Sequence, residues 1–316
     1  MKTHRADLIC MLLLLLILLS FLPPAIFKSS NILASRYSDV ITQFLPHQLF
    51  IRQSLIEDGI IPLWNPFELS GNPAFPNPLY PLLAFPHALL NFLPPSLALN
   101  MGFFMHIFLA GFLTYAYARQ VGCAPVASLF AATVFSFGTR SLSHIEAGLY
   151  SRAMFFAYIP LLFLCCERCL SWPGLRSSSL LALAMTLALF TGSIQLLIYG
   201  TILLVLYSLI RVRVTPHKMN AVAAPTRSLG WILAGILISA SLSAVYLLPS
   251  WQLYPLLTRS LPMGFKQYLF MPELSQAGLL LNPKLFGNFS SSTAPPWEFA
   301  LYTGITPLIL IACTPF

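Results

Sequence analysis

The residues best suited to chemistry lie together in one hydrophilic stretch, residues 38–81, of a chain that is otherwise strongly apolar. This stretch begins with Ser38 and Asp39, and it later contains Trp64 and Asn65 within a Pro-Leu-Trp-Asn-Pro segment. A positioned carboxylate can remove a proton from a reacting hydroxyl as a general base. We therefore take Asp39 as the candidate catalytic residue, and Trp64 and Asn65 as candidate substrate-binding residues in the wall of the same site.

Asp39 also has an interpretation that involves no chemistry. The spacing of apolar residues over 40–57 predicts a short amphipathic helix lying on a membrane face. An Asp or Ser just before such a helix is a preferred N-cap, and both Ser38 and Asp39 are in that position. A cap and a general base are compatible here only if Ser38 supplies the cap.

The elements that must position these residues are membrane-spanning helices. Charged residues make up 8% of the 316 residues and apolar residues 57%, whereas a soluble domain carries about 25% charged residues. This composition excludes a large soluble core and indicates an integral membrane protein. The cysteine cluster at 165–169 has no nearby His, so we interpret these cysteines as small packing residues, with a zinc site as the weaker alternative.

Apolar runs along the chain predict about eight spans, since a bilayer span needs about 20 apolar residues. The run 8–27 follows Lys2 and Arg5 and is interpreted as an uncleaved anchor, with a cleaved signal peptide as the alternative. The stretch 177–210 is too long for one span and short for two, and we expect a hairpin around 191–195. The predicted spans cover residues 8–27, 97–118, 125–139, 153–170, 177–192, 195–210, 229–249 and 299–315.

The predicted fold is therefore an all-α, polytopic transmembrane protein. Its expected organisation is an N-terminal anchor helix (1–28), a first extracytoplasmic loop (29–96) with the amphipathic helix, a transmembrane helix bundle (97–249), a second extracytoplasmic loop (250–298) and a final span (299–316).

The net charge of +8 is explained by membrane topology. With the N-terminus in the cytoplasm, the predicted inner side holds nine Lys and Arg against two acids, and the outer side holds eight against seven. An excess of basic residues in short inner loops is the positive-inside pattern. The excess base is therefore topological and gives no support to a nucleic-acid partner, and most of the acids are predicted to face outward.

A series of short motifs runs along the chain in a fixed order. Asp39 is followed by Gln43-Phe-Leu-Pro46, Gly59-Ile-Ile-Pro-Leu-Trp-Asn-Pro66 and Gly71-Asn-Pro73. The later motifs are His106…Gly111…Tyr115, Phe135-Ser-Phe-Gly138 with His144, Gly192-Ser-Ile-Gln195, Leu248-Pro249…Ser260, Asn282-Pro283…Phe286-Gly287 and Tyr302-Thr-Gly…Pro307. Together these motifs resemble the YfhO-like family of bacterial membrane proteins, which are taken to be glycosyltransferases of the GT-C type.

Two departures from the family pattern stand out. Residues 192–195 lack the His and Pro of the family's Gly-His-Pro-Gln turn. Family members are usually much longer, whereas this sequence stops inside an apolar run at 314–316. We therefore expect the chain to correspond to the N-terminal half of such a protein, with a C-terminal half that is encoded separately or missing.

The resemblance implies a GT-C-like fold and transfer of a sugar from a polyprenyl-phosphate donor to an envelope glycopolymer or lipid, at the outer face of the bacterial cytoplasmic membrane. Asp39 would be the base. Arg152 and Arg259 are the candidates for holding the departing phosphate, because arginine offers planar donors, with headgroup snorkelling as the alternative. Gln195 is a candidate for a sugar hydroxyl, with a hairpin-stabilising hydrogen bond as the alternative, and His144 is a further substrate-binding candidate.

We assign no metal ligand and no organic cofactor. Some GT-C enzymes use a divalent cation, and Asp39, His144 and Glu146 are the residues that would hold one here. The alternative functions are a transporter or flippase for a lipid-linked substrate, and an inactive fragment of a longer enzyme. A transporter should carry ionisable residues in the middle of its spans, and His106 is the one such candidate near a predicted span centre.

Overall fold

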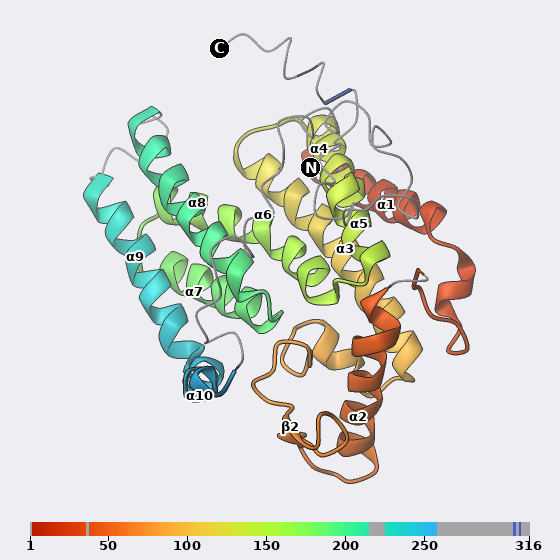
Figure 1. Ribbon diagram of the computed structural model, residues 1–316. Helices are drawn as coiled ribbons and strands as arrows, with labels where there is room; N and C mark the ends of the chain where they lie inside the picture. Colours follow the sequence, from red (N-terminus) through yellow and green to blue (C-terminus); the bar gives the residue numbers. More distant parts are fainter. Residues whose placement is uncertain (1, 36–37, 215–224, 258–305, 308–309, 311–316) are drawn as a thin grey trace, which may run out of the picture.

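The computed structural model describes residues 2–35, 38–214, 225–257, 306–307 and 310 of the chain (Figure 1). The predicted second loop and final span, 250–298 and 299–316, lie almost entirely outside the described residues, and Arg259 lies outside them too.

Regular structure in the described part of the chain is almost entirely helical, which confirms the all-α prediction. The α-helices are α1 (Lys2–Phe21), α2 (Leu45–Ile56), α3 (Pro95–Gln120), α4 (Pro125–Phe137), α5 (Thr139–Ala147), α6 (Tyr150–Ser171), α7 (Leu175–Phe190), α8 (Ile194–Val214), α9 (Pro225–Leu242) and α10 (Ala244–Leu253). A π-helical turn covers Val40–Phe44, and 3-10 turns cover Pro24–Phe27, His87–Leu90 and Tyr254–Leu256. The strands β1 (Trp64–Asn65) and β2 (Asn72–Pro73) form a small antiparallel ladder.

The long helices form one bundle in which α3 and α6 lie side by side at the centre (Figure 1). Helix α4 packs on α3, α7 packs on α6, and α9 packs on α7. Small residues allow this close approach, as membrane bundles favour: a Cβ on Gly111 of α3 would stand 2.5 Å from Ser136 Oγ and 2.9 Å from a Leu14 methyl group. Cys165, Cys166 and Cys169 are buried in the core between α6, α7 and α8, which fits the predicted packing role.

Among the described residues, three helices, α3, α6 and α8, are long and apolar enough to cross a membrane, and a fourth candidate is the pair α9 and α10, bent by 65°. This is fewer than the eight runs in the sequence, of which the run 299–315 lies almost entirely outside the described residues. The run 8–27 forms most of α1, a 20-residue helix that carries Lys2, Arg5 and Asp7 in its first two turns and ends at Phe21, before the Pro23-Pro24 pair. The run 125–139 yields only the 13-residue α4, which is about 20 Å long, and α7 has 16 residues.

The predicted hairpin at 191–195 is present as a break between α7 and α8. Helix α7 ends at Phe190, and Gly192 takes a φ of +84°, a left-handed conformation that favours glycine. The chain then enters α8 at Ile194. The break therefore puts residues 192–196 at an end of the bundle.

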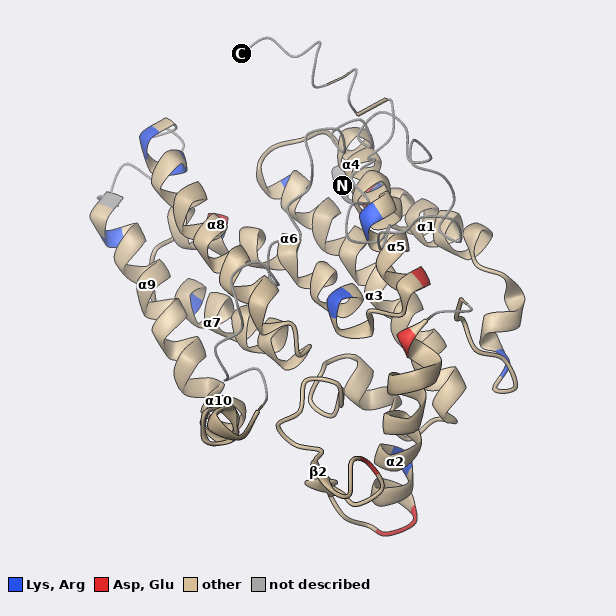
Figure 2. Cartoon of the chain, in the orientation of Figure 1, with Lys and Arg blue, Asp and Glu red and all other residues tan. Residues whose placement is uncertain are grey.

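Ion pairs tie several helix ends together at the other end of the bundle. Arg119 Nε, near the end of α3, donates to Asp7 Oδ1 of α1 at 2.9 Å. Arg211 Nε, near the end of α8, donates to Glu167 Oε1 of α6 at 2.8 Å. Figure 2 shows Lys and Arg at the matching ends of α8 and α9, while several acids lie toward α2 and β2.

Helices α6 and α8 both run toward the charged end, where Glu167 and Arg211 lie near their last turns, so their first residues lie together at the opposite end. A 20-residue helix is roughly 30 Å long, which matches the apolar thickness of a bilayer. Under the positive-inside rule, the charged end is predicted to be cytoplasmic and the starts of α6 and α8 are predicted to be at the outer face.

Helix α2 differs from the predicted amphipathic helix in what it buries. Its buried residues are His47, Gln48, Ile51 and Ser54, whereas the apolar Leu49 and Ile56 are exposed. Gln48 Nε2 donates to Asn91 Oδ1 at 3.0 Å, and His87 Nε2 donates to Gln48 Oε1 at 3.0 Å. The helix therefore packs its polar face into the interior of its own loop.

Candidate active site

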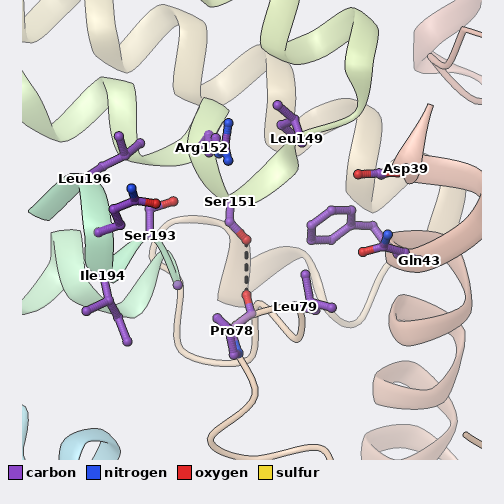
Figure 3. A pocket seen from close by; sticks show the side chains of 13 residues that line it. Asp39, Gln43, Pro78, Leu79, Leu149, Ser151, Arg152, Ser193, Ile194 and Leu196 are labelled. Carbon is purple, nitrogen blue, oxygen red and sulfur yellow. Dashed lines mark hydrogen bonds between the residues drawn. The ribbon is translucent and has the colours of Figure 1, made fainter. Parts of the chain in front are cut away.

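One pocket lies at the starts of α6 and α8 and is formed by segments that are far apart in the sequence (Figure 3). Its volume of about 580 Å³ falls within the range of small-molecule sites. The lining residues are Asp39, Gln43, Phe44, Pro78, Leu79, Leu149, Ser151, Arg152, Gly192, Ser193, Ile194, Gln195 and Leu196. Three residues predicted from separate segments, Asp39, Arg152 and Gln195, thus meet in a single cavity.

Asp39 is positioned by its neighbours, and its carboxylate is not used as a helix cap in the described structure. The backbone N–H of Val40 donates to Ser38 Oγ at 3.2 Å, so Ser38 supplies the local cap. Gly148, with a φ of +74°, ends α5 against this segment, and a Cβ there would stand 2.2 Å from Ser38 Oγ and 2.6 Å from Asp39 N. The condition set by the sequence for Asp39 to act as a base is therefore met.

Burial and the neighbouring charge of Arg152 set the acidity of the Asp39 carboxyl group. Partial burial raises the pKa of Asp39 above its ordinary value, and the nearby Arg152 guanidinium partly lowers it again. A raised pKa makes a carboxylate a stronger base. The pairing of a carboxylate and a guanidinium in one cavity also allows a proton acceptor and an anion-stabilising cation to act on one substrate.

Arg152 is held in place because the start of α6 is tied to the first loop. Ser151 Oγ donates to the Pro78 carbonyl oxygen at 3.1 Å, as drawn in Figure 3. Gly192 approaches the same carbonyl from the break before α8: a Cβ on Gly192 would stand 2.4 Å from Pro78 O. The Pro78 carbonyl therefore joins the loop, the start of α6 and the start of α8 around the pocket.

Gln195 and Ser193 form the α8 side of the pocket. Gln195 is exposed to the cavity, and its Nε2 donates to Tyr199 Oη one turn further along α8 at 2.8 Å. Gln195 and Ser193 both line the pocket. Ser193 is only 8% exposed, and within the described part of the chain its hydroxyl has no hydrogen-bond partner.

Trp64 and Asn65, predicted to lie in the wall of the site, are not among the residues that line this pocket. Asn65 is buried, and both ends of its side-chain amide form hydrogen bonds within the first loop. Its Nδ2 donates to Tyr80 Oη at 2.7 Å, and its Oδ1 accepts from the Phe67 N–H at 2.9 Å. The Trp64 ring covers Gly71, where a Cβ would stand 2.5 Å from it. Both residues shape the β1–β2 turn.

His144 is also outside the pocket lining. It is buried in α5, its ring lies 5.1 Å from that of Phe156, and within the described residues neither ring nitrogen has a hydrogen-bond partner. Burial, with added repulsion from Arg140 and Arg152, lowers the pKa of His144 to about 3. His144 is thus neutral and lies near Arg140 and Arg152. It does not line the pocket in which a substrate is proposed to bind.

The geometry offers no metal site among the described residues. No three His, Cys, Asp or Glu side chains in that part of the chain lie close enough together to share a metal ion. Asp39, His144 and Glu146 all belong to it and do not form such a group.

Three polar pocket residues were not predicted, namely Gln43, Ser151 and Ser193. Gln43 lies four residues after Asp39 in a helical segment, so helical spacing already puts the two side chains on one face. Ser151 adjoins Arg152 directly. Ser193 carries no such signal, because a Ser before a helix normally indicates a cap.

The comparisons with known proteins add no relative from which a role could be carried over. No protein-family model, no curated protein and no solved structure matches this chain.

Proposed function

We propose that this protein is a membrane glycosyltransferase of the GT-C type that transfers a sugar from a polyprenyl-phosphate donor to an envelope glycopolymer or lipid. The observation that carries the proposal is that Asp39 and Arg152 line one pocket, with amide and hydroxyl side chains around them. The resemblance of the motif series to the YfhO-like family supports the same reaction class.

The reaction divides between the two charged residues. The acceptor hydroxyl oxygen attacks the anomeric carbon, and its proton passes to the Asp39 carboxylate. The bond from the anomeric carbon to the phosphate oxygen breaks, and its electron pair leaves with the lipid phosphate. Arg152 stabilises the negative charge that grows on that phosphate. Gln43 and Gln195 are positioned to bind sugar hydroxyls between them.

The location of the pocket supports a lipid-linked donor. The pocket lies at the first turns of two helices that are long and apolar enough to span a membrane, about one bilayer thickness from the charged end of the bundle. In the proposed topology the N-terminus is cytoplasmic and the pocket opens on the outer face of the bacterial cytoplasmic membrane. Membrane lipid, the donor and the acceptor are then the partners.

Transport of a lipid-linked substrate receives less support. Lys, Arg, Asp and Glu in α3, α6 and α8 lie only near the helix ends. The buried His106 near the middle of α3 donates from Nδ1 to the Gly102 carbonyl of its own helix at 2.7 Å. The described residues of α3, α6 and α8 therefore contain no row of charged side chains through the middle of these spans.

The test is a transfer assay with the chain in membranes, together with any adjacent reading frame, using a labelled polyprenyl-phospho-sugar. Asp39→Asn keeps the size of the side chain and removes the base, so we expect transfer to fall by about 10²–10⁴-fold. Glu146→Gln is the matched control, because Glu146 is an exposed carboxylate near the pocket that does not line it. Wild-type transfer by Asp39→Asn, or an equal loss in both variants, would show that the base is misassigned.

A further inference from the structure

The pocket has two chemically distinct ends (Figure 3). Asp39 and Gln43 come from the segment that leads into α2, while Ser151, Arg152 and Ser193 come from the starts of α6 and α8. The first end carries an acid. The second carries a guanidinium and two hydroxyl groups.

Two helix N-termini point at the second end. The carbonyl of Leu149 accepts the N–H of Ala153 at 2.9 Å, and the carbonyl of Ser193 accepts the N–H of Leu197 at 3.0 Å. These are the first intrahelical bonds of α6 and α8, so the N–H groups of the preceding turn have no partner within their own helix. Residues 151–152 of α6 and 194–196 of α8 belong to those turns, and all of them line the pocket.

Ser193 supplies an independent sign that something binds here. It occupies the N-cap position of α8, is 8% exposed and lines the pocket, yet its hydroxyl has no hydrogen-bond partner among the described residues. A buried hydroxyl without a partner costs about 1–3 kcal/mol. A ligand with acceptor oxygens would satisfy the Ser193 hydroxyl together with the first-turn N–H groups of α8, which have no partner within their own helix.

We infer that the starts of α6 and α8 form a subsite for a phosphate monoester or diester, held by Ser193 Oγ, the N–H groups of the α8 first turn and Arg152. Helix N-termini carry partial positive charge and bind anions, and the arginine adds a full charge. Asp39 lies at the other end of the cavity, which leaves the sugar between the phosphate and the base. This inference rests on the proposed function for the order of donor and acceptor, while the phosphate subsite itself is testable without any transfer.

The experiment is calorimetric titration of the purified full chain in detergent with geranyl phosphate, inorganic phosphate and geraniol. We expect geranyl phosphate to bind to the wild type and geraniol to bind much more weakly. Ser193→Ala should weaken the binding of geranyl phosphate about tenfold, the loss of one hydrogen bond to a charged group. Ser136→Ala is the matched control, because Ser136 is another buried hydroxyl without a partner in the described residues, and it does not line this pocket.

Ser193→Asp separates binding from folding. Aspartate is as good an N-cap as serine and its charge favours a helix N-terminus, so the thermal unfolding midpoint should be kept or raised. The same charge repels phosphate, so binding of geranyl phosphate should be lost. Binding of geranyl phosphate by Ser193→Ala and Ser193→Asp at wild-type strength would overturn the subsite, and so would failure of the wild type to bind either phosphate.

The two phosphate probes identify the source of the ligand. Tighter binding of geranyl phosphate than of inorganic phosphate, both sensitive to Ser193, supports a lipid-linked ligand. Equal binding of the two supports the subsite with a free phosphate as its ligand. Ser193-dependent binding combined with wild-type transfer by Asp39→Asn would refute the proposed base and leave the phosphate subsite in place.

Discussion

Replacing Gly148 with alanine perturbs the packing that holds Asp39 against the start of α6. The added Cβ would stand 2.2 Å from Ser38 Oγ and 2.6 Å from the backbone nitrogens of Asp39 and Val40. Real Cβ atoms essentially never approach other heavy atoms closer than 3.0 Å, so Ser38 Oγ must move by about 0.8 Å and the backbone nitrogens of Asp39 and Val40 by about 0.4 Å. Left-handed backbone adds about 1–2 kcal/mol for a residue with a Cβ, and overpacking adds about 1–3 kcal/mol.

Gly59→Ala is the control that isolates the clash. Gly59 has a similar φ of +66°, but nothing lies within 4 Å of the position of its Cβ. We therefore expect Gly59→Ala to show only the backbone cost, and Gly148→Ala to be less stable by a further 1–3 kcal/mol or so. Thermal or denaturant unfolding of the purified chain measures this difference.

The same displacement should affect transfer. A shift of about 1 Å in a catalytic group can reduce the rate about 10²-fold, so Gly148→Ala should lose transfer at a temperature where it is still folded, and Gly59→Ala should not. Equal stability and equal transfer in the two variants would refute the claim that Gly148 sets the position of Asp39.

Two further predictions concern the polar interior of the first loop and the buried histidines. Gln48→Ala leaves the His87 N–H and the Asn91 amide without their partner in α2, so it should lower the free energy of unfolding by about 2–4 kcal/mol. Gln53→Ala, at an exposed position of the same helix, should change the free energy of unfolding little. Similar losses in the two variants would refute the hydrogen-bond network around Gln48. Burial lowers the pKa of His87 and of His144 to about 3, so both are neutral when folded and take up protons when unfolded below about pH 6.5. Stability is then full above that pH and falls by about 1.4 kcal/mol per pH unit for each histidine as the pH drops toward 4.5. Unfolding of His144→Leu should show a shallower fall, and an unchanged slope would contradict a buried neutral His144.

The convergence of Asp39, Arg152 and Gln195 could be predicted because each follows or precedes an apolar run on the same predicted side of the membrane. Spans of similar length bring such positions to one surface. The break before α8 could be predicted from the length of the apolar run 177–210 and from Gly192.

Other features depend on tertiary contacts that no local pattern encodes. Asn65 looked available for a substrate, but Tyr80 and the Phe67 N–H take up its amide. His144 lies on the inner side of α5, against Phe156. The apolar spacing of 40–57 is matched by the buried Val40, Phe44 and Ile51, whereas the burial of Gln48 depends on Asn91 and His87, which follow it by about 40 residues.

The most direct test of the account is which side of the membrane the pocket faces. Cys123 is exposed and follows α3 at the charged end of the bundle, so it serves as an internal marker for the cytoplasmic side. A membrane-impermeant maleimide applied to intact bacterial cells should label Asp39→Cys, and it should label Cys123 only after the cells are permeabilised. Labelling of Cys123 in intact cells, with Asp39→Cys reached only after permeabilisation, would contradict a base that works at the outer face.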